Sequence, residues 1–376
     1  MSDKSKKPNS HADKLKNQAF KKLVKLGESV YQQLADGEYP QFKMPKRTSS
    51  NIYYDPELQQ YTVGKKKIKR SAKNIRHLKP FLQTMFVAMF AARDLLESGR
   101  TSTLRDVYYS SESAMAKMFG DQSESDNIIT DVEAIIGMAR EDFNIFPDAR
   151  STVYGDLTVS FHDKRTDSER EINLTFNPDG QTIGPTLVRS DFVSTKADKV
   201  ICIESGGMFQ RLIEENADEQ FNAILIHLAG QAPRGTRRLI RRLNEELNLP
   251  VYAFVDGDPW GVHIYNVIAA GSASAAHLRG LTTPSAIWMG LTATDIKKYD
   301  LPTDHFSKGD TKRTHQLLQD PRYQKPYLQM ELKRFLKLKK KAEQQSLTSK
   351  SLTFVVDEYL PAKFKEIEKL QKEGKI

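Results

Sequence analysis

Three carboxylates directly follow apolar runs typical of buried strands, and their type and placement could support chemistry. Glu204 follows VICI (200–203), and Asp256 and Asp258 follow VYAFV (251–255). The carboxyl ends of parallel strands meet at one edge of a sheet, so we expect Glu204, Asp256 and Asp258 to converge. At a separation of 4 Å and an effective dielectric constant of 20, each pair of such charges repels by about 4 kcal/mol. Either some of these groups are protonated or a cation lies between them.

The chemical type of these side chains indicates which cation would fit. Oxygen ligands without His or Cys select a hard ion, and Mg²⁺ is the usual one near phosphates. The alternative is that Asp256 and Asp258 only cap the following helix, because DG and DP are turn sequences. A glutamate at the end of a separate strand favours the metal site.

A pair of adjacent tyrosines, Tyr108 and Tyr109 in TLRDVYYSSE (103–112), is the second feature with chemical potential. A tyrosine can form a covalent phosphoryl intermediate when it is deprotonated in place. The ordinary phenol pKa is about 10, and Arg105, one helical turn before Tyr109, would favour the phenolate. On the residues alone, a core role is the better interpretation for either tyrosine. Tyr109 is the preferred nucleophile if one of them reacts.

An arginine-rich segment, GQAPRGTRRLIRRL (230–243), follows the second apolar run of this half of the chain. It predicts a helix with leucines and isoleucine on one side and arginines on the other. Its start and its arginines suit a phosphodiester backbone. The candidate DNA-binding residues are Arg234, Arg237, Arg238, Arg241 and Arg242. A solvated charged face is the alternative interpretation.

Composition limits the class of protein. The formal net charge of the 376 residues is +9 and the sequence pI is about 9.2, which fits a polyanionic partner such as DNA or RNA. The single cysteine, Cys202, excludes an intramolecular disulfide and a multi-cysteine zinc site. The first 18 residues lack the apolar region of a secretion signal. No apolar run approaches the roughly 20 residues of a membrane span. These features predict an intracellular protein without a membrane segment.

The remaining pattern predicts the elements that position these residues. Helices are expected over 19–36, 81–98 and 125–143, with a further helix carrying LRDVYY capped by Thr101, Ser102 or Thr103. Two strand-like runs follow, RSTVYGDLTVSF (150–161) and EINLTF (171–176). The last three of these helices before a strand pair give the order of a winged helix. From about 197, four short apolar runs alternate with helices, which predicts a parallel, doubly wound sheet. Residues 38–75 suggest an extended arm or hairpin, and residues 309–376 suggest helices.

Five motifs carry a resemblance to a known family. They are LRDVYY (104–109), IESGGMFQRL (203–212), GQAPRGTRRLIRRLNEEL (230–247), LPVYAFVDGDPWGVHIY (249–265) and LPTDHFSKGD (301–310). In these motifs the chain resembles the A subunits of archaeal DNA topoisomerase VI, a type IIB enzyme. It is more distantly similar to the meiotic transesterase that makes double-strand breaks.

The resemblance implies an α/β protein in which a winged-helix domain (76–165) precedes a Toprim domain with a mostly parallel doubly wound sheet and a C-terminal helical extension (166–376). It implies that Tyr109 attacks DNA to give 5′-phosphotyrosyl breaks, that Arg105 assists, and that Glu204, Asp256 and Asp258 bind Mg²⁺.

The family's assembly supplies further expectations. Its A subunits form a homodimer on double-stranded DNA, where the tyrosine of one protomer works with the metal site of the other. Each of them pairs with a B subunit that binds ATP, giving an A2B2 heterotetramer, and residues 1–75 are the candidate contact with the B subunit. This chain has no GxxxxGK[ST] sequence, consistent with ATP binding elsewhere. The expected location is the cytoplasm, in association with the nucleoid.

Two other functions stay open at this point. One is a dedicated break-making transesterase that does not reseal DNA. The other is a DNA-binding module without catalytic activity, in which the acidic site has no role.

Overall fold

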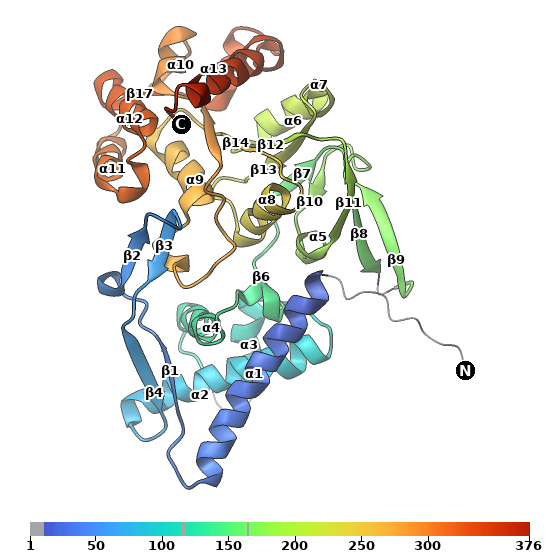
Figure 1. Cartoon of the computed structure of the whole chain (residues 1–376), viewed down its shortest axis with the longest axis vertical. Helices are drawn as coiled ribbons and strands as arrows, with labels where there is room; N and C mark the ends of the chain where they lie inside the picture. The colour runs from blue at the N-terminus through green and yellow to red at the C-terminus, as the bar shows by residue number, and fades with distance from the viewer. Residues whose placement is uncertain (1–10, 114–116, 164) are drawn as a thin grey trace.

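A computed structural model describes residues 11–113, 117–163 and 165–376 of the chain. Figure 1 shows a lower lobe of helices from the N-terminal part and an upper lobe built around a sheet. The first ten residues of the predicted polar tail lie outside the described residues. The helix predicted over 19–36 is longer than expected, because it starts at His11.

The lower lobe consists of helices that bury their apolar stripes in one core. Its helical elements are α1 (His11–Ala35), α2 (Ile75–Met89) with its continuation η2 (Phe90–Glu97), α3 (Leu104–Ser113), α4 (Gln122–Ile136) and the short turn η3 (Arg140–Phe143). Phe81, Val107 and Val132 come from three of these helices and are almost fully buried in the shared core. The helix carrying LRDVYY therefore has a fixed orientation, with Val107 facing inward.

The ends of two of these helices follow from local chemistry. Thr103 starts α3: its hydroxyl accepts a hydrogen bond from the Asp106 amide (3.2 Å), and the Asp106 carboxylate accepts one from the Thr103 amide (2.7 Å). This confirms the predicted cap in TST. The helix predicted over 125–143 ends earlier, at Ile136, because Gly137 adopts a left-handed conformation (φ +63°) that a glycine tolerates.

The predicted arm forms two hairpin-like pairs. Strand β1 (Gln41–Pro45) pairs with β4 (Lys67–Ser71), and β2 (Ile52–Asp55) pairs with β3 (Gln60–Val63), all antiparallel; the short turn η1 (Ser49–Asn51) precedes β2. The β2–β3 pair lies against the upper lobe (Figure 1). There Thr282 donates a hydrogen bond to the Gln60 side chain (2.9 Å), and the Arg322 guanidinium lies 4.9 Å from the centre of the Tyr61 ring. The arm thus joins the two lobes of one chain.

A six-stranded sheet forms the centre of the upper lobe, with the strand order β10-β7-β13-β12-β14-β15. The strands are β7 (Thr152–Tyr154), β10 (Gln181–Thr182), β12 (Lys199–Ile203), β13 (Ala223–His227), β14 (Val251–Phe254) and β15 (Ile287–Gly290). The last four are the predicted strands, and they pair in parallel as expected, with Cys202 opposite both Ile226 and Ala253. Strand β7 joins in the antiparallel direction.

Helices before, between and after the parallel strands complete the upper lobe (Figure 1). They are α5 (Pro185–Arg189), α6 (Gly206–Glu214), α7 (Ala217–Gln220), α8 (Arg234–Glu246), α9 (Pro259–Ala270), α10 (Ala293–Lys298), α11 (Lys308–Gln319), α12 (Pro326–Leu338) and α13 (Leu360–Lys372). Short connecting elements are β5 (Ser102–Thr103), β6 (Ile145–Phe146), β16 (Asp304–His305), β17 (Lys340–Lys341), η4 (Ala273–Ala275), η5 (Pro321–Tyr323), η6 (Gln344–Ser349) and η7 (Val355–Tyr359). In the described part of the chain, no helix is long and apolar enough to cross a membrane.

The strand pair expected to follow the three helices forms, but it belongs to the upper lobe. Strand β8 (Leu157–Asp163) pairs with β9 (Ser168–Asn173) and with β11 (Asp191–Thr195) in a separate three-stranded sheet. Leu157 and Val159 are buried in the same core as the six-stranded sheet, and this burial explains the placement. The expected domain boundary at 165/166 falls between β8 and β9.

The lysine-rich segment ELKRFLKLKKKAEQQ is only partly helical. Helix α12 ends at Leu338, and Lys339 has a left-handed backbone (φ +52°). Strand β17 follows and pairs with β16. The chain then turns toward the carboxyl ends of β12 and β14, where Ala342 and Gly257 form an isolated antiparallel bridge. This turn brings the segment after α12 next to the candidate site.

Candidate active site

The two tyrosines of α3 have different environments. Tyr108 is half-buried and packs against the core of the lower lobe, and a hydrogen bond to Glu112 raises its pKa. Tyr109 is 60% exposed, and its ring meets that of Tyr108 edge-on at 5.2 Å between centroids. Of the two phenols, Tyr109 is therefore the one that a large substrate can reach.

Arg105 lies one turn before Tyr109 on the same helix, as predicted. It is exposed, and its Nε donates to the side-chain oxygen of Gln122 on α4 (3.4 Å). Both Arg105 and Tyr109 thus present functional groups at the surface of the lower lobe. A guanidinium at this position places positive charge on the same face of α3 as the Tyr109 phenol.

Glu204 and Asp256 end the neighbouring parallel strands β12 and β14, so the predicted convergence follows from the sheet order. One oxygen of each predicted carboxylate is held by backbone amides. The Asp256 amide donates to Glu204 Oε2 (3.0 Å), and the Gln344 amide donates to Asp256 Oδ1 (2.9 Å). Asp258 Oδ1 accepts from Trp260 (2.8 Å) and Gly261 (2.7 Å), which makes it the N-cap of α9. The other oxygen of each makes no hydrogen bond to the described residues.

Burial and mutual repulsion disfavour the charged forms of these groups. Burial, followed by repulsion from Asp256 and Asp258, raises the pKa of Glu204 to about 8. Burial also raises the pKa of Asp256 to about 6, against the stabilising Gln344 amide. The pKa of Asp258 is raised by burial too, partly offset by its two amide bonds. Such a group of carboxylates is stabilised by a cation.

The donor set fits a hard divalent ion without enclosing it. Within residues 11–113, 117–163 and 165–376, no three His, Cys, Asp or Glu side chains lie close enough to hold a metal by themselves. Mg²⁺ is commonly bound by one or two carboxylates and completes its shell with water and substrate phosphates. Free oxygens on Glu204, Asp256 and Asp258 match that mode of binding. The capping role of Asp258, left open by the sequence, is present as well.

Two residues of this site, Glu343 and Gln344, were not predicted from the sequence. Glu343 is close enough to raise the pKa values of Glu204 and Asp256. Gln344 is fully buried: its side-chain oxygen accepts from the Ser205 amide (2.8 Å), and its Nε2 donates to the Phe254 carbonyl (3.1 Å). Gln344 therefore holds the loops after β12 and β14 in place. No local pattern revealed it, because its segment was predicted to be helical.

The five arginines of the α8 segment do not form one free cationic face. Four pair with carboxylates of this chain: Arg234 with Glu133 (2.6 Å), Arg238 with Asp142 (2.6 Å), Arg241 with Glu245 and Arg242 with Glu246 (2.6 Å). Arg237 has no ion pair within the described residues, although it is only 6% exposed. Of the five predicted DNA-binding residues, Arg237 is the one that forms no ion pair in the described part of the chain.

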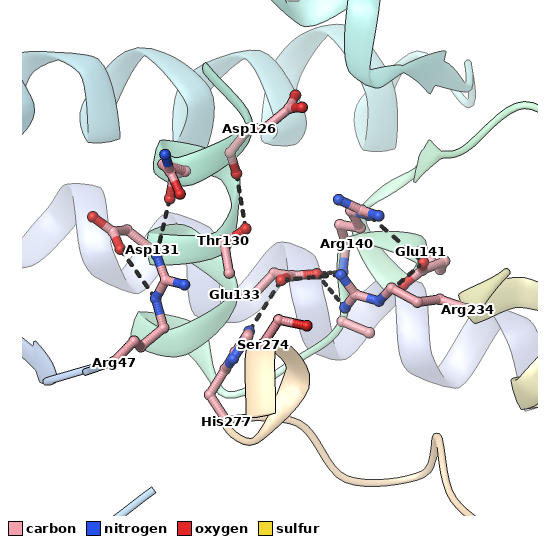
Figure 2. A network of polar contacts seen from close by, with 12 residues as sticks. Arg47, Asp126, Thr130, Asp131, Glu133, Arg140, Glu141, Arg234, Ser274 and His277 are labelled. Atoms are coloured by element: carbon pink, nitrogen blue, oxygen red, sulfur yellow. Dashed lines mark hydrogen bonds and ion pairs between the residues drawn. The ribbon is translucent and has the colours of Figure 1, made fainter. Parts of the chain in front are cut away.

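Glu133 connects the lobes through a buried polar network (Figure 2). It lies on α4, is fully buried, and binds Arg234 of α8 (2.6 Å) and His277 of the upper lobe (3.0 Å). Its Oε1 also accepts a hydrogen bond from the Arg140 amide (2.8 Å). Burial alone would raise the pKa of Glu133, but Arg234 and His277 outweigh it and keep the pKa well below its usual range. The relative placement of α3 and α8 depends on this network.

Replacing Glu133 with alanine should lower the free energy of unfolding by about 3–5 kcal/mol, because Arg234 would lose its closest partner and remain buried with only the more distant Glu141 (3.6 Å). Urea or thermal unfolding measures this change. The matched control is Glu28→Ala at an exposed site on α1, for which we expect a change within about 0.5 kcal/mol. Equal effects of the two substitutions would contradict the importance of the network.

Tyr109 and the acidic cluster are separate within one chain. No hydrogen bond or ion pair among the described residues joins Tyr109 to Glu204, Asp256 or Asp258. Helix α3, which carries Tyr109, lies in the lower lobe, whereas β12 and β14, which precede the carboxylates, lie in the upper lobe (Figure 1). A reaction that uses both would need a second chain or a rearrangement.

Comparison with known proteins gives consistent matches over both lobes. The family described as "Type IIB DNA topoisomerase" matches residues 79–145, and the Toprim-domain family of the topoisomerase 6 A subunit/Spo11 proteins matches residues 199–364. The chain is 43% identical over 352 residues to the A subunit of type 2 DNA topoisomerase 6 from Methanothermobacter thermautotrophicus, covering 93% of this chain and 98% of the relative. The corresponding proteins of Halobacterium salinarum (41% over 354 residues; 93% and 96%) and Archaeoglobus fulgidus (38% over 355 residues; 94% and 98%) are also similar.

Proposed function

The chain belongs to the family of type 2 DNA topoisomerase 6 A subunits, and on that premise we propose that Tyr109 cleaves and rejoins DNA beside an Mg²⁺ held by Glu204, Asp256 and Asp258. It is the catalytic A subunit of a type IIB DNA topoisomerase. The predicted order of a winged-helix domain and a Toprim domain with a mostly parallel sheet is confirmed. The observation that carries the assignment of the nucleophile is the exposure of Tyr109 next to a core-packed Tyr108.

The proposed reaction is a transesterification. The Tyr109 oxygen attacks a backbone phosphorus while the phenol releases its proton to solvent, and the bond to the 3′ oxygen breaks as that oxygen takes up a proton from solvent. The products are a 3′ hydroxyl and a 5′ phosphate linked to the tyrosine. Attack by that hydroxyl reverses each step, so resealing needs no nucleotide hydrolysis.

Arg105 and the carboxylates have distinct roles in this proposal. Arg105, one turn before Tyr109, contacts a phosphate of the substrate strand. Mg²⁺ would stabilise negative charge on the phosphate and the leaving oxygen. Glu204, Asp256 and Asp258 are kept in position for it by the amides that fix one oxygen of each.

The proposed assembly follows from one nucleophile per chain. Cleavage of both strands requires two tyrosines, which a two-fold homodimer supplies. The separation of Tyr109 from the carboxylates of its own chain supports the use of the partner's acidic cluster. We propose further that a B subunit binds ATP and couples its use to strand passage, relaxation and decatenation on intracellular DNA. Residues 1–75 remain the candidate contact for that subunit, although β2–β3 is already packed on the upper lobe.

Mapping the covalent intermediate tests this function directly. The protein, with a B subunit from a related source, ATP and Mg²⁺, is incubated with end-labelled DNA and denatured to trap linked protein. Proteolysis and mass spectrometry should place the nucleotide on the peptide containing Tyr109. A nucleotide on any other residue would reject the assignment, and the absence of trapped DNA would reject the proposed reaction.

A further inference from the structure

An open hollow of about 520 Å³ lies between the start of α3 and the start of α8. Arginines from both lobes line it: Arg105, Arg140, Arg150, Arg234 and Arg237. One carboxylate, the exposed Asp148, lies at its edge. The hollow is therefore rich in positive charge, at the junction of the two lobes.

The arginines that line this hollow differ in whether a carboxylate lies beside them. Arg234 pairs with Glu133, and Arg140 lies 3.7 Å from Glu141. Arg105 and Arg150 instead bond to neutral oxygens, the side chain of Gln122 and the carbonyl of Gln231. Neither of these two exposed guanidiniums forms an ion pair with the described residues.

Arg237 is the most unusual member of the group. It is only 6% exposed, yet its Nε and Nη1 find no hydrogen-bond partner in the part of the chain that the structure describes. Burial, together with the nearby Arg234 and Arg140, lowers its pKa to about 10, and the Glu141 carboxylate opposes this shift only in part. A buried cation that forms no ion pair destabilises the free protein. Its presence at the wall of an open hollow indicates that a ligand supplies the missing negative charge.

The start of α8 adds to this preference for an anion. The helix runs for 13 residues from Arg234, and Pro233 at its N-cap provides no side-chain cap. Pro233 and Arg234 both line the hollow. The positive end of the helix dipole therefore lies beside the unpaired guanidinium.

We propose that this hollow binds a phosphate of the DNA strand that Tyr109 attacks, with Arg237 as its buried contact and Arg105 and Arg150 at its opening. The proposal rests on the proposed function for the identity of the strand. Arg105 lies four residues before Tyr109 on α3, a rise of about 6 Å. A phosphate held beside Arg105 would position the neighbouring stretch of the same strand against the phenol.

Binding of duplex DNA across a range of salt concentrations tests the contact. Arg237→Gln is compared with Arg93→Gln, which removes the same charge at an exposed site paired with Asp94. Both are made in a Tyr109→Phe protein, so that cleavage does not interfere. Arg237→Gln should weaken binding by about tenfold and reduce the slope of log K against log salt by about 0.9. Arg93→Gln should leave the slope unchanged, and equal slopes for the two variants would overturn the proposal.

Thermal unfolding separates ligand binding from a structural role. Removing an uncompensated buried charge should leave the Tm of the free protein unchanged or raise it, so a lower Tm for Arg237→Gln would overturn the proposal. Inorganic phosphate serves as a second probe. If it stabilises the wild type but not Arg237→Gln while their DNA affinities agree, the site takes a free anion and the DNA assignment fails. Covalent adduct formation by the Tyr109-containing protein tests the proposed function separately, because these binding measurements do not depend on cleavage.

Discussion

Replacing Tyr109 with phenylalanine will abolish covalent protein–DNA adducts, a loss of more than about 10³-fold, because the phenyl ring has no oxygen to form the phosphoryl bond. The substitution removes one exposed hydroxyl and leaves the ring in its contact with Tyr108. We therefore expect unchanged folding and unchanged DNA binding. Adducts are measured on denaturing gels with labelled DNA after incubation with Mg²⁺ and the ATP-binding partner.

Tyr108→Phe is the matched control, because it removes the neighbouring hydroxyl from the same helix. Its ring packs against the core of the lower lobe, and its hydroxyl contacts Glu112 rather than open solvent. Adduct formation should stay within a few-fold of the wild type. If Tyr108→Phe abolished adducts and Tyr109→Phe did not, the nucleophile would be Tyr108. Adducts with both variants would exclude this helix as the source of the nucleophile.

Glu204→Gln will remove most of the response to Mg²⁺. In the wild type, Mg²⁺ at 100 times its Kd should raise the free energy of unfolding by about 2.7 kcal/mol. The variant should lose most of this stabilisation and cleave DNA about a hundredfold more slowly or worse. Without metal it should be as stable as the wild type or more so at pH 8.5, because an amide needs no counter-ion. Glu214→Gln, an exposed change on α6, is the matched control.

The pH dependence of this response has a definite sign. The pKa of Glu204 is about 8 in the folded protein, against 4.5 for the free side chain. Between these values the metal-free folded state holds an extra proton, so its stability falls as pH rises through that window. Mg²⁺ must displace this proton, and the lower proton occupancy at higher pH makes binding easier. The Mg²⁺-induced rise in Tm should therefore be larger at pH 8.5 than at pH 6. A rise that is equal at both values would contradict the proposed role of Glu204.

Much of the acidic site could be predicted from sequence because it depends on strand order. Short apolar runs separated by helices specify parallel pairing, and parallel pairing brings Glu204 and Asp256 to one edge of the sheet. The cap of α3 was predictable as well, because Thr103 and Asp106 are local partners. Features that depend on neighbouring residues or on strand order could therefore be predicted from the sequence pattern.

Other features depend on contacts between distant residues that have no fixed spacing. The expected arginine face of α8 is largely neutralised, and two of its partners, Glu133 and Asp142, come from the lower lobe. Gln344 reaches Ser205 across 139 positions. The hairpin after the helices packs on the upper lobe because Leu157 and Val159 share its core. Alternation predicts a strand but does not say which core the strand joins.

The position of Gln344 in the chain bears on how the protein is made. A nascent polypeptide that has emerged only to residue 340 already contains the reactive tyrosine and the three acids, but lacks the side chain that links the loops after β12 and β14. We therefore expect the proposed metal site to form only when translation has passed this glutamine. If the proposed function holds, competence to cleave DNA is acquired late in synthesis, and we expect a copy terminated before Gln344 to form no covalent adduct with DNA.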